Sequence, residues 1–210
     1  MPVRTSVDVA NRSLDMIGTS TLGAITDTTP EGLICSRNYN ICRQAVLRMH
    51  PWNFAMSRKI LTITNDQNPV APSFDYLYSL YLPLDYLRLT NVMDSAGIDV
   101  LNFADWQLEG KCVLTNTDTL WIRYVKDAID VDDFDPVFFN CLALNLAWVI
   151  SYKLTQSNTL KDQLWKDFLA AVSKAKFVDS IENPGLSIDN DVWMRSRLGP
   201  SQGFVRDPQT

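Results

Sequence analysis

Metal and cofactor motifs are missing from this chain. It has one histidine, His50, and its four cysteines show no CxxC spacing, whereas a zinc or redox site draws on several imidazole or thiolate groups at workable spacing. Its eight glycines form no GxGxxG pattern and no GxxxxGK followed by Ser or Thr, so the usual phosphate cradles are not indicated. We therefore predict no catalytic residue, no metal site and no cofactor.

Positive charge is also scarce. The formal net charge is −5, and the sequence contains no run of lysine or arginine. Duplex binding draws much of its free energy from basic side chains that displace counterions. A general DNA-binding module is therefore the least favoured of the functions that we consider.

No long hydrophobic run is present. The most apolar stretch, Val137 to Ile150, is shorter than the roughly 20 residues that span a bilayer, and Asn140 and Asn145 interrupt it. Residues Met1 to Val9 lack the apolar core of a signal peptide. We expect a soluble protein that is made in the cytoplasm and has no membrane partner.

The segment around His50 is the most informative feature that is present. An apolar stripe at spacings of four and three indicates a helix before it: Cys35, Tyr39, Cys42, Val46 and Met49. Pro51 lacks an amide hydrogen and disfavours helical dihedrals at the preceding residue, so this helix should end at His50. We predict that His50, Pro51, Trp52 and Phe54 anchor the helix exit, and that His50 has a structural role.

Helical patterns flank a strand pattern. One amphipathic helix follows the Thr5 and Asp8 capping box, and a second begins at Thr29-Pro30-Glu31. From Lys59 the apolar period becomes two, which indicates a small antiparallel sheet or barrel, and two more helices follow Asp135 and Thr159. We predict an α+β, mainly α fold: an antiparallel four-helix bundle (1–57 and 127–182) with an inserted antiparallel β domain (58–126) and an extended C-terminal tail (183–210).

The densest acidic cluster precedes the third helix and consists of Asp127, Asp130, Asp132, Asp133 and Asp135. It lacks the central glycine and the terminal glutamate of a calcium-binding loop. We therefore expect a solvated connection that leads to Asp135, which should cap the helix that follows.

The tail after Glu182 has a different composition from the rest of the chain. Pro184, Gly185 and Gly199 interrupt any period, so the tail cannot build a core of its own. It carries isolated anchor residues and nearby positive charge: Trp193, Met194, Arg195 and Arg197. We predict that these four residues bind a partner protein.

Several segments resemble, in the same order, the head-to-tail adaptor proteins of short-tailed bacteriophages, also called tail tubular protein A. They are Cys42-Arg43, His50-Pro51-Trp52-Asn53-Phe54-Ala55, Leu80 to Arg88, Leu108-Glu109-Gly110-Lys111, Leu120-Trp121-Ile122-Arg123-Tyr124 and Asp133-Phe134-Asp135-Pro136. The resemblance covers roughly residues 5 to 182. It implies a helical bundle with a β insertion and a structural virion protein without catalytic residues.

The resemblance also implies partners and a location. The protein would form a ring, dodecameric in that family, at the head–tail junction of the virion, between the portal protein and the tail nozzle protein. DNA would be only a passing genome that is not recognised by sequence. The tail residues Trp193, Met194, Arg195 and Arg197 would bind the portal.

One enzyme class stays open as an alternative. A glycoside hydrolase needs only two carboxylates at a suitable separation, and the sequence has 24 acidic residues. Glu31 is the least implausible acid, although its position in a first helical turn explains it more simply. The alternative function is therefore a peptidoglycan-degrading glycoside hydrolase of a phage tail.

Overall fold

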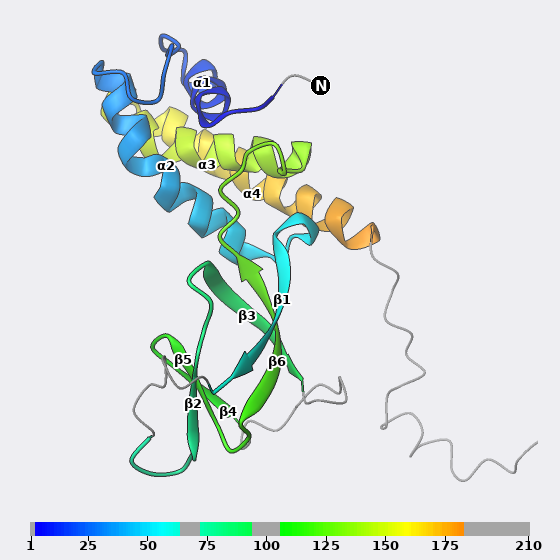
Figure 1. The fold of residues 1–210 in the computed structure, drawn as a ribbon. Helices are drawn as coiled ribbons and strands as arrows, with labels where there is room; N and C mark the ends of the chain where they lie inside the picture. Colours follow the sequence, from blue (N-terminus) through cyan, green and yellow to red (C-terminus); the bar gives the residue numbers. More distant parts are fainter. Residues whose placement is uncertain (1–2, 64–71, 94–105, 183–210) are drawn as a thin grey trace, which may run out of the picture.

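The computed structural model describes residues 3–63, 72–93 and 106–182, with two helices before its strands and two after them (Figure 1). The helices are α1 (Ser6–Ile17), α2 (Pro30–Met49), α3 (Pro136–Thr155) and α4 (Asn158–Ile181), and a short 3-10 turn, η1 (Asn53–Ala55), follows α2. The strands are β1 (Met56–Thr62), β2 (Tyr78–Tyr81), β3 (Tyr86–Met93), β4 (Trp106–Glu109), β5 (Cys112–Thr115) and β6 (Thr119–Lys126). The predicted portal-binding residues, Trp193, Met194, Arg195 and Arg197, and the rest of the tail lie outside the described residues.

Short polar side chains start the helices where the sequence places them. The backbone N–H of Thr5 donates to Asp8 (2.7 Å) ahead of α1, and the hydroxyl of Thr29 accepts from the N–H of Gly32 (3.2 Å) at the start of α2. Asp135 accepts from the N–H of Val137 (2.6 Å) and caps α3 as predicted. The cap of α4 is Ser157 instead of the predicted Thr159.

The predicted four-helix bundle is wrong, because α3 is a central helix that the other three cover. Seven consecutive residues of α3, from Cys141 to Ala147, are buried, and seven residues span nearly two turns, so every side of the helix is covered. Helices α1, α2 and α4 pack mainly on α3 and contact one another little. A bundle needs four helices that each turn one apolar stripe to a shared axis, whereas α3 itself forms the centre here.

The strands form two sheets instead of the predicted single sheet or barrel. One antiparallel sheet has the order β1-β6-β3 and the other has the order β2-β5-β4. Their facing sides enclose a second apolar cluster, the strand core: Leu61, Leu80, Leu82, Val92, Val113, Leu120, Ile122 and Tyr124. The α+β class therefore holds, with one apolar cluster among the helices and another between the sheets.

Helix α3 is long and apolar enough to cross a membrane by length and composition alone. It has 20 residues, with a mean hydropathy of 1.4 in its most apolar window, 56% of which is buried against the rest of the chain. The core helix of a globular protein has the same properties. The apolar run from Val137 to Ile150, predicted to be too short to span a bilayer, is thus part of a longer helix, Pro136–Thr155.

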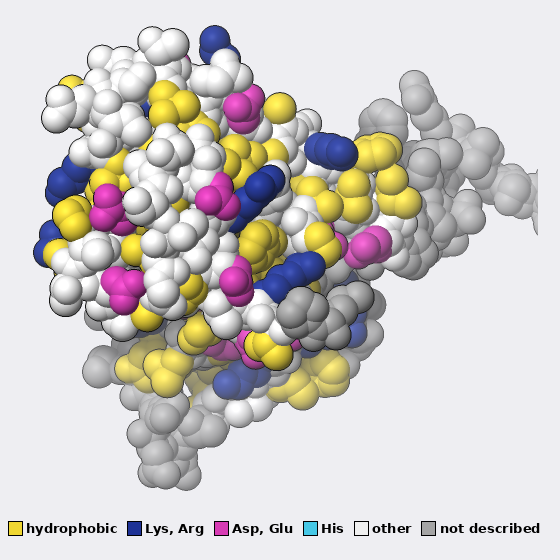
Figure 2. All heavy atoms as spheres, turned by 90° about the horizontal axis from the view of Figure 1, so that it is seen from above, with side chains coloured by type: hydrophobic (Ala, Val, Ile, Leu, Met, Phe, Trp, Pro, Cys, Tyr) yellow, Lys and Arg dark blue, Asp and Glu magenta, His cyan; other side chains and the backbone are white. Residues whose placement is uncertain are grey.

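Large hydrophobic side chains also reach the surface of the helical part. They include Ile41 on α2 and Leu169, Phe177 and Ile181 on α4. Seen from above, hydrophobic side chains lie among basic and acidic ones on this surface (Figure 2). Met49, predicted to continue the buried stripe of α2, is exposed, and Leu47 is buried in the core instead.

Candidate functional site at the joint between helices and strands

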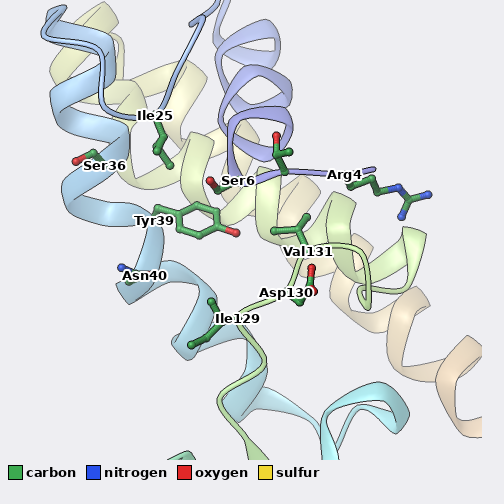
Figure 3. Close-up of a pocket in the computed structure, with 10 residues that line it drawn as sticks. Arg4, Ser6, Ile25, Ser36, Tyr39, Asn40, Ile129, Asp130 and Val131 are labelled. Atoms are coloured by element: carbon green, nitrogen blue, oxygen red, sulfur yellow. The ribbon is translucent and has the colours of Figure 1, made fainter. Parts of the chain in front are cut away.

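A pocket of about 490 Å³ lies between the start of α1, the middle of α2 and the loop before α3 (Figure 3). The side chain of Tyr39 is buried at its wall, and its hydroxyl has no hydrogen-bond partner among the described residues. Burial raises the pKa of Tyr39 to about 12, against the smaller opposing effect of Arg43. The phenol is therefore neutral at physiological pH and is no general base.

Neither this pocket nor a second one between α2 and α3 brings together the pair of carboxylates that a glycosidase uses. Asp130 is the one acid that lines the first pocket. The second pocket, of about 410 Å³, is lined by Arg37 and Lys153 and by no acid. Glu31 lies in the first turn of α2, outside both. Within the described ranges, no group of three His, Cys, Asp or Glu side chains is placed to hold a metal ion.

One catalytic pattern does occur, in the tail. Residues Gly199 to Gly203 read GxSxG, the pattern of a serine nucleophile elbow, and they lie outside the described residues. Such a serine needs a base, usually histidine. His50, the single histidine of the chain, lies between α2 and β1. We call the region where the helices meet the β1-β6-β3 sheet the joint.

The residues predicted to anchor the helix exit come together at this joint. Helix α2 ends at Met49, His50 is extended ahead of Pro51, and the ring of Trp52 turns inward until only 1% of it is exposed. The Trp52 Nε1–H donates to the carbonyl of Val46 (3.0 Å), which lies in the last turn of α2 and has no partner within the helix. The Trp52 indole thus both fills the core and closes the helix end.

Aromatic rings from three segments pack edge to face around this exit. Trp52 and Phe54 lie 5.1 Å and 4.9 Å from Phe138 of α3, measured between ring centroids, and Phe134 lies 5.0 Å from Phe138. His50 lies 5.0 Å from Trp52 on the other side. Such edge-to-face pairs add to the free energy gained from burial alone.

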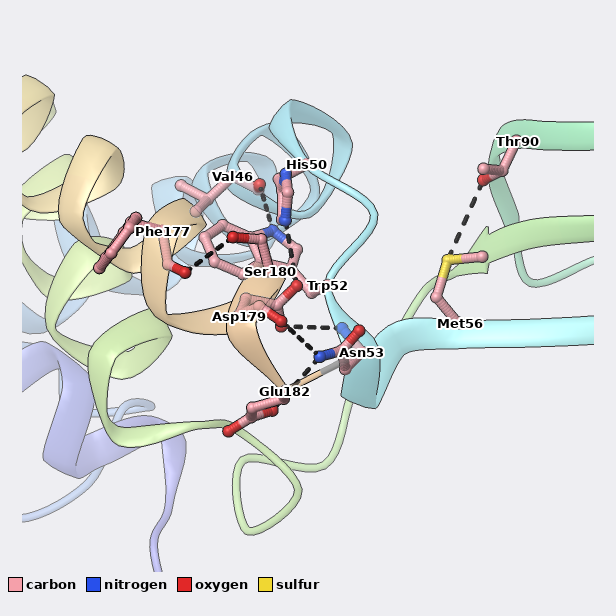
Figure 4. Close-up of polar contacts among 10 residues, drawn as sticks. All are labelled: Val46, His50, Trp52, Asn53, Met56, Thr90, Phe177, Asp179, Ser180 and Glu182. Carbon is pink, nitrogen blue, oxygen red and sulfur yellow. Dashed lines mark hydrogen bonds and ion pairs between the residues drawn. The ribbon is translucent and has the colours of Figure 1, made fainter. Parts of the chain in front are cut away.

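Asp179, near the end of α4, fastens the joint (Figure 4). Its Oδ2 lies 3.0 Å from His50 Nε2, and its Oδ1 accepts from the backbone N–H of Asn53 (3.0 Å). The side-chain amide of Asn53 donates to the backbone carbonyl of Asp179 (2.8 Å). One buried carboxylate therefore joins α4 to the segment between α2 and β1.

A second fastening lies where the chain returns from β6 to the helices. The Arg43 guanidinium, buried on α2, pairs with Asp127 and donates to the carbonyl of Ala128. The side-chain amide of Gln44 donates to the other Asp127 oxygen (2.9 Å). Asp127 was predicted to belong to a solvated connection, and this is wrong, since it is an ion-pair partner of a buried arginine.

A third contact reaches α2 from β3. The Arg88 guanidinium donates to the carbonyl of Arg48 (3.0 Å) in the last turn of α2. That carbonyl also lacks a partner within the helix, and a cation is favoured at this end of the helix dipole. The contact is exposed.

Sequence reasoning missed Asp179 and Arg43 as parts of the joint. A signal exists for Asp179, because it continues the stripe of buried α4 residues: Leu164, Phe168, Val172 and Ala175. An acid on the buried stripe of a helix needs a partner. The partner itself, 129 residues away along the chain, cannot be read from a local pattern.

The four cysteines are free thiols, and Cys35, Cys42 and Cys141 are buried. Burial raises the pKa of Cys35 to about 11, with help from Glu31, and that of Cys42 to about 12. Burial, with a smaller contribution from Asp135, raises the pKa of Cys141 to about 11. At pH 8 the thiolate fraction of each is on the order of 0.1% or less.

We therefore expect a disulfide reagent at pH 8 to modify one thiol per folded chain, the half-buried Cys112, and the other three only on unfolding. The C112S variant should hardly react with the reagent until denaturant is added. Since the raised pKa values delay ionisation in the folded state alone, the free energy of unfolding should fall as pH rises from about 9 to 12. Rapid modification of all four thiols in the folded protein would contradict this burial.

Comparison with known proteins adds no family. No protein-family model matches the chain, and no curated protein matches it significantly.

Proposed function

We propose that this protein is a structural virion protein, a head-to-tail adaptor that forms a ring between the portal and the tail nozzle of a short-tailed phage. The proposal rests on the ordered resemblance of its segments and on one structural observation. Large apolar side chains are exposed on the helical part: Ile41, Leu169, Phe177 and Ile181. Phe177 and Ile181 lie one turn apart on the same side of α4, and exposed apolar side chains that lie together are typical of surfaces that bind other proteins.

The chemistry of the joint agrees with this proposal. His50 pairs with Asp179 and Arg43 pairs with Asp127, and none of these side chains lines either of the two pockets described above. Their role is to hold the helices against the strands. DNA would pass through the ring without sequence recognition, and the protein would be made in the host cytoplasm and reside at the head–tail junction.

The proposal is tested by adding the purified protein to the portal ring of the phage that carries it. Native mass spectrometry should detect a single complex with one added ring, dodecameric if the resemblance holds. Hydrolysis of purified peptidoglycan, measured in parallel, should stay at the level of buffer. A protein that degrades peptidoglycan and leaves the portal unbound would favour the glycoside hydrolase instead.

A truncated chain tests the predicted portal-binding residues. A chain that ends at Glu182 should keep its helix content and melting temperature, since α4 ends at Ile181, but should lose the portal. The full-length quadruple alanine variant of Trp193, Met194, Arg195 and Arg197 should behave in the same way, because a few anchors carry most of the binding free energy at such interfaces. Portal binding at wild-type affinity by either variant would remove these residues from the interface.

A further inference from the structure

One face of the β1-β6-β3 sheet presents arginine and large apolar side chains to solvent. Directly opposite residues share a face, and the two residues next to them point to the other face. Leu61 and Leu120 therefore point into the strand core, while two cross-strand pairs, Arg58 with Arg123 and Ile60 with Trp121, point away from it. We call these four residues the open sheet face. Ile60 is 49% exposed and Trp121 38% exposed.

The two arginines of this face are not neutralised by the described part of the chain. Like charges directly opposite each other on neighbouring strands are destabilising. The ion pairs between described residues are Arg43 with Asp127 and His50 with Asp179, and neither involves Arg58 or Arg123. The Nε of Arg123 is buried without a hydrogen-bond partner among the described residues. The face therefore offers an exposed arginine, Arg58, and a half-buried one, Arg123, beside exposed Trp121 and Ile60. Tryptophan and arginine are enriched among the side chains that dominate binding at protein interfaces.

A surface of opposite charge lies on the same chain, in the loop between β6 and α3. Ile129 is 72% exposed there, and Asp130, Asp132 and Asp133 beside it are exposed as well. We call Ile129, Asp130, Asp132 and Asp133 the acidic loop. It combines an apolar side chain with carboxylates, as the open sheet face combines apolar side chains with guanidinium groups. Arginine forms its strongest ion pairs with carboxylates in two-pronged geometry.

We propose that the open sheet face of one subunit receives the acidic loop of the next subunit. The inference rests on the proposed ring and names the two surfaces that would build it. A two-fold dimer through the open sheet face would set arginine against arginine, which electrostatic repulsion opposes. Contact between two different surfaces is head-to-tail, and its repetition closes into a ring when the rotation from one subunit to the next divides a full turn.

Nucleic acid is the competing occupant of the open sheet face. Phosphate groups would also pair with Arg58 and Arg123. The formal charge of −5 weakens long-range attraction to a polyanion. A third arginine on this side of the sheet, Arg88 opposite Val125, already donates to the Arg48 carbonyl. Ile60 has no role in phosphate binding, whereas it matches the exposed Ile129 of a second copy.

Charge reversal tests the pairing. The R58E/R123E variant makes both surfaces acidic, and the D130K/D133K variant makes both basic. Each variant alone should associate at least about a hundredfold more weakly than wild type, in sedimentation velocity and in ring formation on the portal, because like charges then face each other. An equimolar mixture should restore association, with the two variants in equal numbers by native mass spectrometry.

Two controls separate pairing from general charge effects and from misfolding. The D15K/D162K variant, altered on exposed residues of α1 and α4, carries the same charge change as D130K/D133K and should associate like wild type without rescuing R58E/R123E. Should R58E/R123E fail to fold by circular dichroism, R58E/I60E replaces it, since both altered side chains are exposed.

Three outcomes would overturn the inference. Wild-type rings formed by R58E/R123E would show that the face lies outside the subunit contact and would leave the adaptor function standing. Loss of duplex DNA retention by R58E/R123E with unchanged assembly would identify a phosphate-binding surface. A wild-type protein that stays monomeric with and without the portal would contradict both this inference and the proposed function.

Discussion

Replacing Trp52 by alanine is expected to lower the free energy of unfolding by about 3–5 kcal/mol. The Trp52 ring is 1% exposed and packs against Phe138 at 5.1 Å between centroids. Its removal leaves a cavity beneath the exit of α2, and the Val46 carbonyl loses the donor that it has in the indole. Denaturant unfolding followed by circular dichroism measures the loss, provided that the slope of the transition is unchanged.

Two further variants divide this effect into parts. Trp52→Phe keeps most of the ring volume and removes the indole N–H, so it should cost about 1–3 kcal/mol for the unsatisfied carbonyl and the smaller ring. Trp165→Ala, at a tryptophan that is 37% exposed, should cost less than half as much as Trp52→Ala. Equal losses in the free energy of unfolding at Trp52 and Trp165 would mean that the complete burial of Trp52 adds no stability beyond that of a partly exposed tryptophan.

Replacing Arg43 by methionine is expected to cost about 3 kcal/mol, because removal of one partner leaves the other charge of a buried pair uncompensated. Arg43 is 3% exposed, whereas Asp127 keeps 19% exposure and can recover some hydration. Methionine preserves the aliphatic stem, so the measured loss reports the guanidinium group and its contacts with Asp127 and Ala128.

Arg37→Met is the matched control, since Arg37 lies on the exposed side of the same helix and should change the free energy of unfolding by less than about 0.5 kcal/mol. The R43M/D127N double variant should be more stable than the sum of its single variants predicts, because the unpaired charge disappears. Strict additivity would show that the two side chains do not act as a pair.

Local chemistry made part of the fold predictable. The side chains of Asp8, Thr29 and Asp135 accept from backbone N–H groups within three positions of themselves, so their effect can be predicted from the neighbouring residues in the sequence. Pro51 ends α2 for the same kind of reason. The inward turn of Trp52 and Phe54 was predictable because Pro51 forces a turn and large aromatic side chains next to it are more stable in the core than in water.

Long-range packing explains what the sequence did not reveal. Four amphipathic or apolar helices suggested a bundle, but the continuous burial of α3 from Cys141 to Ala147 sets it apart as a helix covered from several sides. The fastenings of the joint connect residues 84 and 129 positions apart, Arg43 with Asp127 and His50 with Asp179. Asp127 looks like a solvated surface residue until its partner is known. Asp179 falls on the buried stripe of α4, but the stripe does not identify His50 as its partner, because no period or cap links the two halves of either pair.

The three attachments of the β1-β6-β3 sheet follow its strand order along one edge. The Asp179 contacts precede β1, the Arg43 contacts follow β6, and the Arg88 contact belongs to β3. Contacts at several points along one edge prevent the sheet from twisting or sliding relative to the helices, but they allow it to rotate about that edge. This rotation is opposed by the apolar side chains of Met56, Leu87 and Val125, which pack against the helical core. Because apolar packing weakens on cooling, the angle between the helices and this sheet should vary more at low temperature, before any polar contact at the edge breaks.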